Sequence, residues 1–287
     1  MKLGLCLSGG GVKGAAHIGV IKALEDENIK PDCISGTSSG SIVAALYAMG
    51  YSSEEMIYLF KSYGKQISKI NFWIIVKIIL GLIFTGKIHV DGLNNGYKIE
   101  KLIQNQARNK KINLIRDIKL PLIIPSVDII DGSTIIFSSL KNNRDYSDKI
   151  NVINDIEIGK AVQASCSYPG IFCPTNVSGK KLIDGGVREN TPWKEFKKIG
   201  AEKILSVVFS EERKIENNIN IIKCVTRSMG IMMHELYNYE VEGNEYLLKI
   251  KTDNTGLLEI NKIEELYEIG YKVTKKEINK IKEYLRK

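Results

Sequence analysis

The first fifty residues contain two apolar strands, and each runs through a glycine-rich turn directly into a helix. The first strand covers residues 2–7 and is followed by the run GGGVKG at residues 9–14. The second covers residues 32–37 and leads into a helix of small residues at 39–50. Turns this tight leave little room for side chains, and strands joined to helices in this way form a parallel sheet covered by helices.

Strands and helices alternate along the rest of the chain as well. Residues 120–139 form two β-branched runs joined at Asp131 and Gly132, the pattern of a β-hairpin. Further strands are expected at 180–184, 203–210 and 245–250, with helices at 51–64, 97–106, 156–165 and 221–239 and a basic helix at the C-terminal end. The chain shows no internal repeat and no proline- or serine-rich linker. We therefore expect one α/β domain, a three-layer sandwich with a central, mostly parallel sheet.

Composition restricts the class of partner. The chain is 44% hydrophobic and 26% charged, as in an ordinary soluble globular protein, and its formal net charge is +8. That excess favours an anionic partner, either nucleic acid or the surface of an anionic membrane, and does not by itself choose between them. We do not expect nucleic-acid binding, because only the net charge and the lysine-rich final helix point to it, and such a helix is usually a solvated face.

The number and spacing of the cysteines and histidines argue against disulfides and against a metal site. The five cysteines are odd in number and have no CxxC spacing, which favours free thiols in a reducing compartment such as the cytoplasm. The three histidines, His17, His89 and His234, do not stand at ligand spacing to a cysteine pair, so no metal site is predicted. The first apolar run ends at Ser8 and is too short for a signal peptide.

One almost continuous apolar segment, FWIIVKIILGLIF, runs from Phe72 to Phe84. It is shorter than the roughly 20 residues that a helix needs to span a bilayer. Two interpretations stay open for it: a buried core helix, or an interfacial or lid helix at the mouth of an apolar site.

The glycine run at residues 9–14 exposes backbone N–H groups and therefore suits an anion. Its first, third and sixth residues fit the G-x-G-x-x-G pattern of dinucleotide-binding folds. Those folds also need an acidic residue at the end of the second strand, where this chain has Ser35-Gly36-Thr37. A Walker A loop needs Ser or Thr after its lysine, but Lys13 is followed by glycine. An oxyanion hole beside a nucleophile explains the run better.

The second turn reads GTSSG from Gly36 to Gly40 and places Ser38 at the centre of a G-x-S-x-G sequence. A serine on such a strand-to-helix turn has strained backbone angles that push its hydroxyl clear of the chain. Glycine is needed two residues before and two residues after it, because side chains there would crowd the turn. The N-terminus of the following helix, from Ser39, would stabilise developing negative charge. We therefore predict that Ser38 is a nucleophile.

Ser38 needs a general base, and none of the histidines is an obvious one. His234 and His17 lie within predicted helices, and His89 does not stand in a turn or glycine-rich context. The strongest carboxylate candidate is Asp184, which ends an apolar strand and is followed by two glycines that would let the backbone come close to Ser38. Apolar surroundings would raise its pKa and make it a stronger base. The alternative is that Asp184, Gly185 and Gly186 form a turn that has no catalytic role.

Three motifs together resemble the signatures of the patatin-like phospholipases, in the same order along the chain. They are Gly9-Gly10-Gly11-Val12-Lys13-Gly14, Gly36-Thr37-Ser38-Ser39-Gly40 and Asp184-Gly185-Gly186. The segment ASCSYPGIFCP before the aspartate strand, NTP after it and the hairpin SVDIIDGSTIIF are also similar to that family. The similarity covers about residues 3–210 of a single domain, 1–287, and leaves residues 211–287 as a C-terminal extension packed on it.

The resemblance implies a patatin-like fold related to cytosolic phospholipase A2, and lipid acyl hydrolysis by a Ser-Asp dyad without histidine. By motif, Ser38 would be the nucleophile and Asp184 the base. The amides of Gly10 and Gly11 would form the oxyanion hole, with Gly9 beside them. Gly36, Ser39 and Gly40 would build the nucleophile turn, and Gly185 and Gly186 would support the base. Lys13, where the family often has arginine, would add positive potential, meet a lipid phosphate or be solvated.

No metal or cofactor is implied. We expect an enzyme of the cytoplasm that cleaves phospholipids or other lipid esters and associates peripherally with anionic membrane. Two rivals stay open: a catalytically silent protein of the same fold that only binds lipid or acyl chains, and a dinucleotide-dependent enzyme, which the missing acidic residue disfavours.

Overall fold

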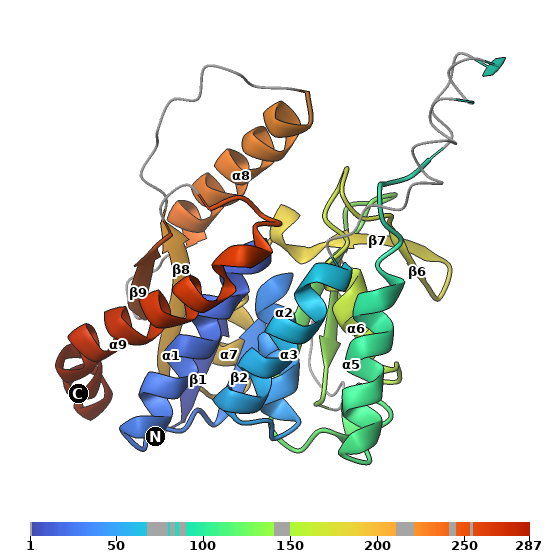
Figure 1. Ribbon diagram of the computed structural model, residues 1–287. Helices are drawn as coiled ribbons and strands as arrows, with labels where there is room; N and C mark the ends of the chain where they lie inside the picture. The colour runs from blue at the N-terminus through green and yellow to red at the C-terminus, as the bar shows by residue number, and fades with distance from the viewer. Residues whose placement is uncertain are drawn as a thin grey trace.

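The computed structural model describes residues 2–67, 80, 84–85, 90–140, 150–210, 221–240, 245–252 and 255–287 (Figure 1). The strands are β1 (Leu3–Leu7), β2 (Cys33–Gly36), β3 (Leu122–Asp128), β4 (Thr134–Ser138), β5 (Ile150–Ile153), β6 (Thr175–Val177), β7 (Lys180–Asp184), β8 (Lys203–Ser210) and β9 (Tyr246–Lys251). The helices are α1 (Gly14–Asp26), α2 (Ser39–Ala48), α3 (Ser53–Ile67), α5 (Tyr97–Asn109), α6 (Ile158–Ser165), α7 (Lys194–Lys198), α8 (Ile221–Glu240) and α9 (Ile263–Arg286).

The strands form one mixed sheet in the order β5-β4-β3-β2-β1-β8-β9, with β7 attached to β3 and β6 attached to β7. The strands from β3 through β2, β1 and β8 to β9 pair in parallel. Strand β4 pairs antiparallel with β3 and so forms the predicted hairpin, and β7 is also antiparallel to β3. The prediction of a central, mostly parallel sheet is confirmed.

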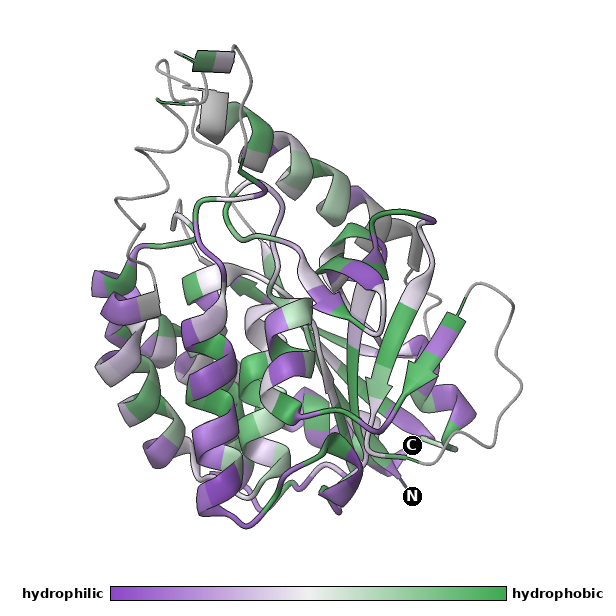
Figure 2. Cartoon of the chain, turned by 90° about the vertical axis from the view of Figure 1, so that its right-hand side faces the viewer, coloured by the Kyte–Doolittle hydropathy of each residue, from purple (hydrophilic) through white to green (hydrophobic). Residues whose placement is uncertain are grey.

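Helices cover the sheet on both faces. Helices α1, α9, α2, α3 and α5 lie on one face, and α7 lies on the other (Figure 1). The larger apolar core fills the first side, and a smaller one that includes Cys6, Trp193 and Phe196 fills the side of α7. The central strands are largely hydrophobic, whereas the helices mix hydrophobic and hydrophilic residues (Figure 2). This is the three-layer arrangement expected from the sequence.

Strand β3 changes partners along one of its edges, and this change positions the site. Near its start, residues 122–123 lie opposite residues 34–35 of the parallel strand β2. Further along, residues 126–128 lie opposite residues 184–182 of the antiparallel strand β7. The ends of β2 and β7 therefore face each other beside β3, which brings the turn after β2 next to Asp184.

Most elements predicted from the sequence are confirmed within a few residues of their expected bounds. The helix expected at 39–50 ends at Ala48, and Gly50 follows with a φ of 82°. The sequence pattern does not predict β5, β6 or α7, because segments of 3 to 5 residues are too short to show a period.

The C-terminal region is packed against the motif-bearing part of the chain. A Cβ atom at Gly19 of α1 would stand 2.0 Å from the carbonyl oxygen of Tyr267, and one at Gly270 of α9 would stand 2.0 Å from that of Ala16. The two helices thus touch backbone to backbone, which only glycine permits. Strand β9 adds to the sheet beside β8.

Most of the apolar segment Phe72–Phe84 lies outside the described residues, so both interpretations of it stay predictions. Two of its residues are described, and Leu80 and Phe84 are 46% and 78% exposed. In the described part of the chain, no helix combines the length and the apolar character that crossing a membrane requires.

Candidate active site

Ser38 occupies the sharp turn between β2 and α2. Its backbone angles, φ 53° and ψ −124°, lie in a region that residues with a side chain rarely adopt. Such a conformation costs about 1–3 kcal/mol and persists only where the surroundings enforce it. Ser41 helps to enforce it, because its hydroxyl donates to the carbonyl oxygen of Ser38 at 2.6 Å. The strained turn predicted from the sequence is present.

The glycines around Ser38 are required by close backbone contacts. A Cβ atom at Gly36 would stand 2.2 Å from the carbonyl oxygen of Gly40, and one at Gly40 would stand 2.4 Å from that of Leu7. A Cβ atom at Gly9 would lie 3.0 Å from the Cβ of Ser38. The glycine run and the nucleophile turn therefore lie against each other.

Asp184 is the last residue of β7 and is fully buried. Its Oδ1 accepts a hydrogen bond from the N–H of Gly186 at 2.8 Å. Burial raises the pKa of the carboxyl group from its ordinary value of 3.8 to about 7. The Ser38 side chain and the Gly186 N–H act in the opposite direction and offset part of this increase. A carboxyl group with this pKa is a much better proton acceptor at neutral pH than an ordinary aspartate.

The second carboxyl oxygen, Oδ2 of Asp184, is buried and has no hydrogen-bond partner among the described residues. The Ser38 side chain is nevertheless close enough to lower the pKa of Asp184. The two side chains are therefore close to each other without a complete hydrogen bond between them in the described structure.

The two glycines after Asp184 allow close approaches to β3 and α8. A Cβ atom at Gly185 would stand 2.5 Å from the carbonyl oxygen of Pro125 in β3. One at Gly186 would stand 2.1 Å from the Met233 side chain of α8 and 3.1 Å from Oδ1 of Asp184. They hold Asp184 against β3 and leave its carboxylate uncrowded.

The amides of the glycine run are not equivalent. The N–H of Gly9 donates to Oδ1 of Asn190 at 3.0 Å and is therefore occupied. The N–H groups of Gly10 and Gly11 make no hydrogen bond within the described structure. Asn190 belongs to the NTP segment, to which the sequence analysis assigned no role of its own.

Lys13 is 4% exposed, so it is not a solvated lysine. Its backbone N–H donates to the carbonyl oxygen of Gly10 at 3.3 Å, which closes the 3-10 turn of residues Gly11–Lys13.

His17 is close to the site in sequence but is used structurally. Its Nε2 lies 2.8 Å from the carbonyl oxygen of Ser8, and its ring packs on Phe209 with centroids 4.5 Å apart. Burial lowers its pKa to about 4, so the ring is neutral at pH 7. His89 and the side chain of His234 lie outside the described residues.

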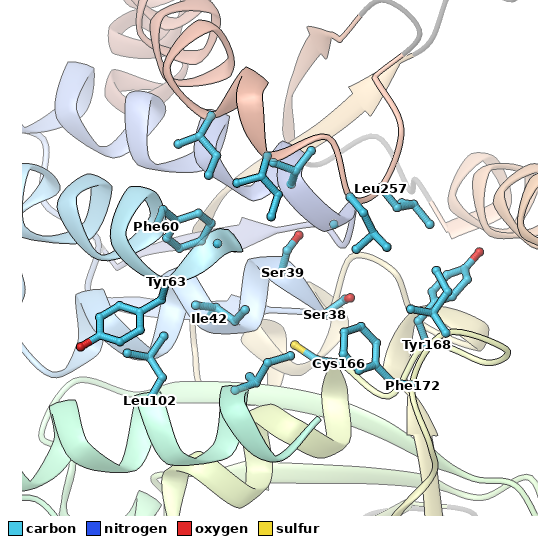
Figure 3. A pocket seen from close by; sticks show the side chains of 18 of the residues that line it. Ser38, Ser39, Ile42, Phe60, Tyr63, Leu102, Cys166, Tyr168, Phe172 and Leu257 are labelled. Carbon is cyan, nitrogen blue, oxygen red and sulfur yellow. The ribbon is translucent and has the colours of Figure 1, made fainter. Parts of the chain in front are cut away.

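Ser38 lines an apolar pocket of about 130 Å³ (Figure 3). Its walls come from α2, α3 and α5, from the segment after α6, and from the segment that leads into α9. They include Ile42, Leu46, Leu59, Phe60, Tyr63, Leu102, Phe172, Leu257 and Ile263. The sequence analysis found none of these residues, because apolar pocket walls look like ordinary core positions in a sequence.

The geometry joins a strained serine, a buried carboxyl group with a raised pKa, two amides without hydrogen-bond partners among the described residues, and an apolar pocket. The patatin-like phospholipase family matches residues 5–197. The chain belongs to this family. Patatin-like phospholipases are lipid acyl hydrolases, and the matched region contains all three motifs that the sequence analysis singled out.

Several relatives of the patatin-like domain are known. Lysophospholipase NTE1 of Meyerozyma guilliermondii is 31% identical over 205 residues, which is 71% of this chain but 12% of that protein. Protein R571 of Acanthamoeba polyphaga mimivirus is 29% identical over 300 residues, covering 96% of this chain and 94% of R571. The crystal structure of VipD from Legionella pneumophila shares the fold, with a TM-score of 0.50 and 14% identity over 97% of this chain and 67% of VipD.

Proposed function

We propose that the protein is a serine acyl hydrolase that cleaves ester bonds of phospholipids or other lipid esters through a Ser38-Asp184 dyad. The observation that carries this proposal is the buried Asp184 carboxyl group, with a pKa of about 7, beside the strained Ser38, which lines an apolar pocket. Among the described side chains, the only histidine is His17, whose ring is neutral and packed on Phe209.

The reaction has two half-reactions, acylation and deacylation of Ser38, and each of them needs two proton transfers. Asp184 takes the proton of the Ser38 hydroxyl as its Oγ attacks the ester carbonyl carbon, and the resulting oxyanion is held by the N–H groups of Gly10 and Gly11. Each such donor stabilises the transition state by about 3 kcal/mol. Asp184 then gives the proton to the leaving alcohol, which leaves an acyl group on Ser38. Asp184 then deprotonates a water molecule, which attacks the acyl carbonyl carbon. As the bond from that carbon to Ser38 Oγ breaks, Asp184 returns the proton to Oγ, which releases the fatty acid and restores the serine hydroxyl.

The apolar pocket supports a lipid rather than a polar substrate. Its wall side chains are nearly all aliphatic or aromatic, and Ser38 is one of the residues that line it (Figure 3). An acyl chain bound there would place its ester carbonyl at Ser38 and its headgroup outside. The relatives named lysophospholipase agree with such a substrate class.

We also propose that the protein works in the cytoplasm and associates peripherally with anionic membranes. None of the five cysteines forms a disulfide in the described structure, and the net charge is +8. Two exposed apolar side chains lie at the site's edge of the sheet: Leu258, which also lines the pocket and is 40% exposed, and Ile130, which is 77% exposed in the turn after β3. Side chains of this kind suit contact with a lipid surface.

A serine-reactive fluorophosphonate probe tests the proposal, with labelling measured by intact mass and peptide mapping. We expect labelling at Ser38 in the wild type, none in Ser38→Ala, and strongly slowed labelling in Asp184→Asn. Ser206→Ala is the matched control, because it also removes a buried serine hydroxyl, in β8 and away from the pocket, and should leave Ser38 labelled. His234→Ala should label like the wild type.

Two results would contradict the dyad. Loss of labelling in folded His234→Ala would indicate a triad. A folded wild type that is neither labelled nor able to turn over lipid esters, yet still binds fatty acid, would support the catalytically silent lipid-binding protein instead.

A further inference from the structure

The turn after α6, residues 165–167, touches both members of the proposed dyad. Ser165 is the last residue of α6 and is fully buried. Its Oγ accepts a hydrogen bond from the backbone N–H of Ser38 at 3.1 Å. Two residues later, the carbonyl oxygen of Ser167 accepts the backbone N–H of Asp184 at 3.0 Å. A single short turn therefore sets where both residues sit.

A second contact joins the same turn to the nucleophile. The Sγ of Cys166 lies 3.8 Å from the hydroxyl of Ser41, and that hydroxyl donates to the carbonyl oxygen of Ser38 at 2.6 Å. Both polar groups of the Ser38 backbone are thus held by neighbours, the N–H by Ser165 and the carbonyl by Ser41. The strained angles of Ser38 depend on such external support.

We propose that Ser165 is a positioning residue, which holds the Ser38 backbone so that its hydroxyl faces Asp184. The inference rests on the proposed function. Ser165 is not among the residues that line the pocket, so it acts through Ser38 and not by touching substrate. A hydrogen bond from a side chain to the backbone of the nucleophile can fix a reacting atom to within a fraction of an ångström, and a displacement of about 1 Å can slow a reaction about 100-fold.

The test compares Ser165→Ala with Thr175→Val. Thr175 is a matched control because its hydroxyl is also buried and lies 2.8 Å from the Ser167 hydroxyl, but it makes no hydrogen bond to Ser38 or Asp184 within the described structure. For each variant we would measure the melting temperature, kcat and KM on a soluble ester, the rate of fluorophosphonate labelling, and the pH dependence of kcat.

For Ser165→Ala we expect kcat and labelling to fall about 10- to 100-fold, with KM changed less than about threefold. We also expect the rising limb of the pH profile to move to higher pH, because the Ser38 contact that lowers the pKa of Asp184 is weakened. Thr175→Val should lose a similar amount of thermal stability and keep the kcat and pH limb of the wild type.

A folded Ser165→Ala variant with the kcat and pH limb of the wild type would overturn the inference. Equal loss of kcat in Thr175→Val would also overturn it, since packing of the turn would then explain both. If Ser165→Ala does not fold, Ser165→Cys keeps the volume with a weaker acceptor. The Ser165→Cys variant should show the same displacement of the rising limb to higher pH, and a limb at the wild-type position would overturn the inference. Failure of the proposed function looks different: the folded wild type would not be labelled at Ser38.

Discussion

Asp184 is a carboxyl group held where its negative charge is poorly solvated. Burial raises its pKa to about 7, whereas the nearby Asp131, which is exposed and hydrogen-bonded to Ser133, has its pKa lowered. The difference shows why environment, and not residue type, decides which carboxylate can serve as a base near neutral pH.

The pH dependence of the reaction follows from this pKa. Only the deprotonated carboxylate accepts the Ser38 proton, so kcat/KM for an uncharged ester should rise through about pH 7 and level off above it. The measurement is a rate profile from about pH 5 to pH 9. A rate already at its plateau at pH 5 would indicate a base with an ordinary carboxylate pKa and would contradict the assignment.

The same pKa predicts an effect on stability. The folded-state pKa is raised, so between about pH 4 and pH 7 the folded chain holds a proton that the unfolded chain has released, and the free energy of unfolding falls as pH rises through this window. Asp184→Asn removes the effect. It should abolish turnover yet raise the free energy of unfolding at pH 8, by up to the order of 4 kcal/mol.

Denaturant titrations at pH 8 and pH 4 check this, and the gain should shrink at the lower pH. Asp128→Asn is the control. Asp128 is also a buried aspartate at the end of a strand, but its carboxylate accepts a hydrogen bond from Lys180 at 3.1 Å, so its replacement should destabilise the fold. A loss of stability in Asp184→Asn at pH 8 would count against the raised pKa.

At the scale of elements, α2 forms one wall of the pocket along its length. Ser38, Ile42 and Leu46 share one face of the helix, and a rise of about 1.5 Å per residue puts Leu46 about 12 Å beyond Ser38. An extended acyl chain advances about 1.25 Å per carbon, so about nine or ten carbons can lie along this wall.

Ile42→Trp should therefore shorten the usable pocket. We expect kcat/KM for esters of eight or more carbons to fall at least about tenfold, while acetyl and butyryl esters change little, because only longer chains reach past Ile42. A series of p-nitrophenyl esters measures this. An equal loss for all chain lengths would show that the acyl chain does not lie along α2.

The segment before α9 braces the glycine run. The N–H of Val12 donates to the carbonyl oxygen of Leu257 at 2.9 Å, and a Cβ atom at Gly11 would stand 2.4 Å from that oxygen. Gly11 also has a φ of 61°, in the left-handed region. The shape of the proposed oxyanion hole thus depends on a residue that lies far outside the family match.

Gly11→Ala should lower kcat more than about tenfold by displacing this contact. Gly50→Ala is the control: its φ is 82°, but a Cβ atom there would meet nothing within 4 Å. Both variants should lose about 1 kcal/mol from backbone strain, and only Gly11→Ala should lose activity. Similar activity in the two variants, measured with an ester substrate, would show that the Leu257 contact does not shape the site.

These elements also show what could and could not be predicted from the sequence. Glycine and serine at fixed spacing around Ser38 predict a strained turn, because the sterics of that turn are local. The approach of Asp184 to Ser38 depends on β2 and β7 sharing one edge of β3, and no local pattern encodes such a register. The pocket walls and Ser165 were not predicted, since their roles exist only through distant neighbours.

At the scale of the whole molecule, we expect residues 1–287 to act as one domain with an excess of positive charge. The net charge of +8 should attract anionic lipid, and screening by salt weakens attraction between exposed charges. Binding to vesicles that contain anionic lipid should weaken several-fold between about 50 mM and 500 mM NaCl, as measured by co-sedimentation. Neutral vesicles are the control, and binding that does not change with salt would exclude an electrostatic contribution.

The brace between Leu257 and the glycine run has a consequence for the order of synthesis. During translation, the glycine run leaves the ribosome before the serine turn, Asp184 follows much later, and Leu257 comes later still. A nascent chain that already carries every motif residue therefore still lacks the contact that shapes its glycine run. We expect lipid hydrolysis to begin only after the segment around Leu257 has folded against that run, so that partly made molecules do not attack the membranes around them.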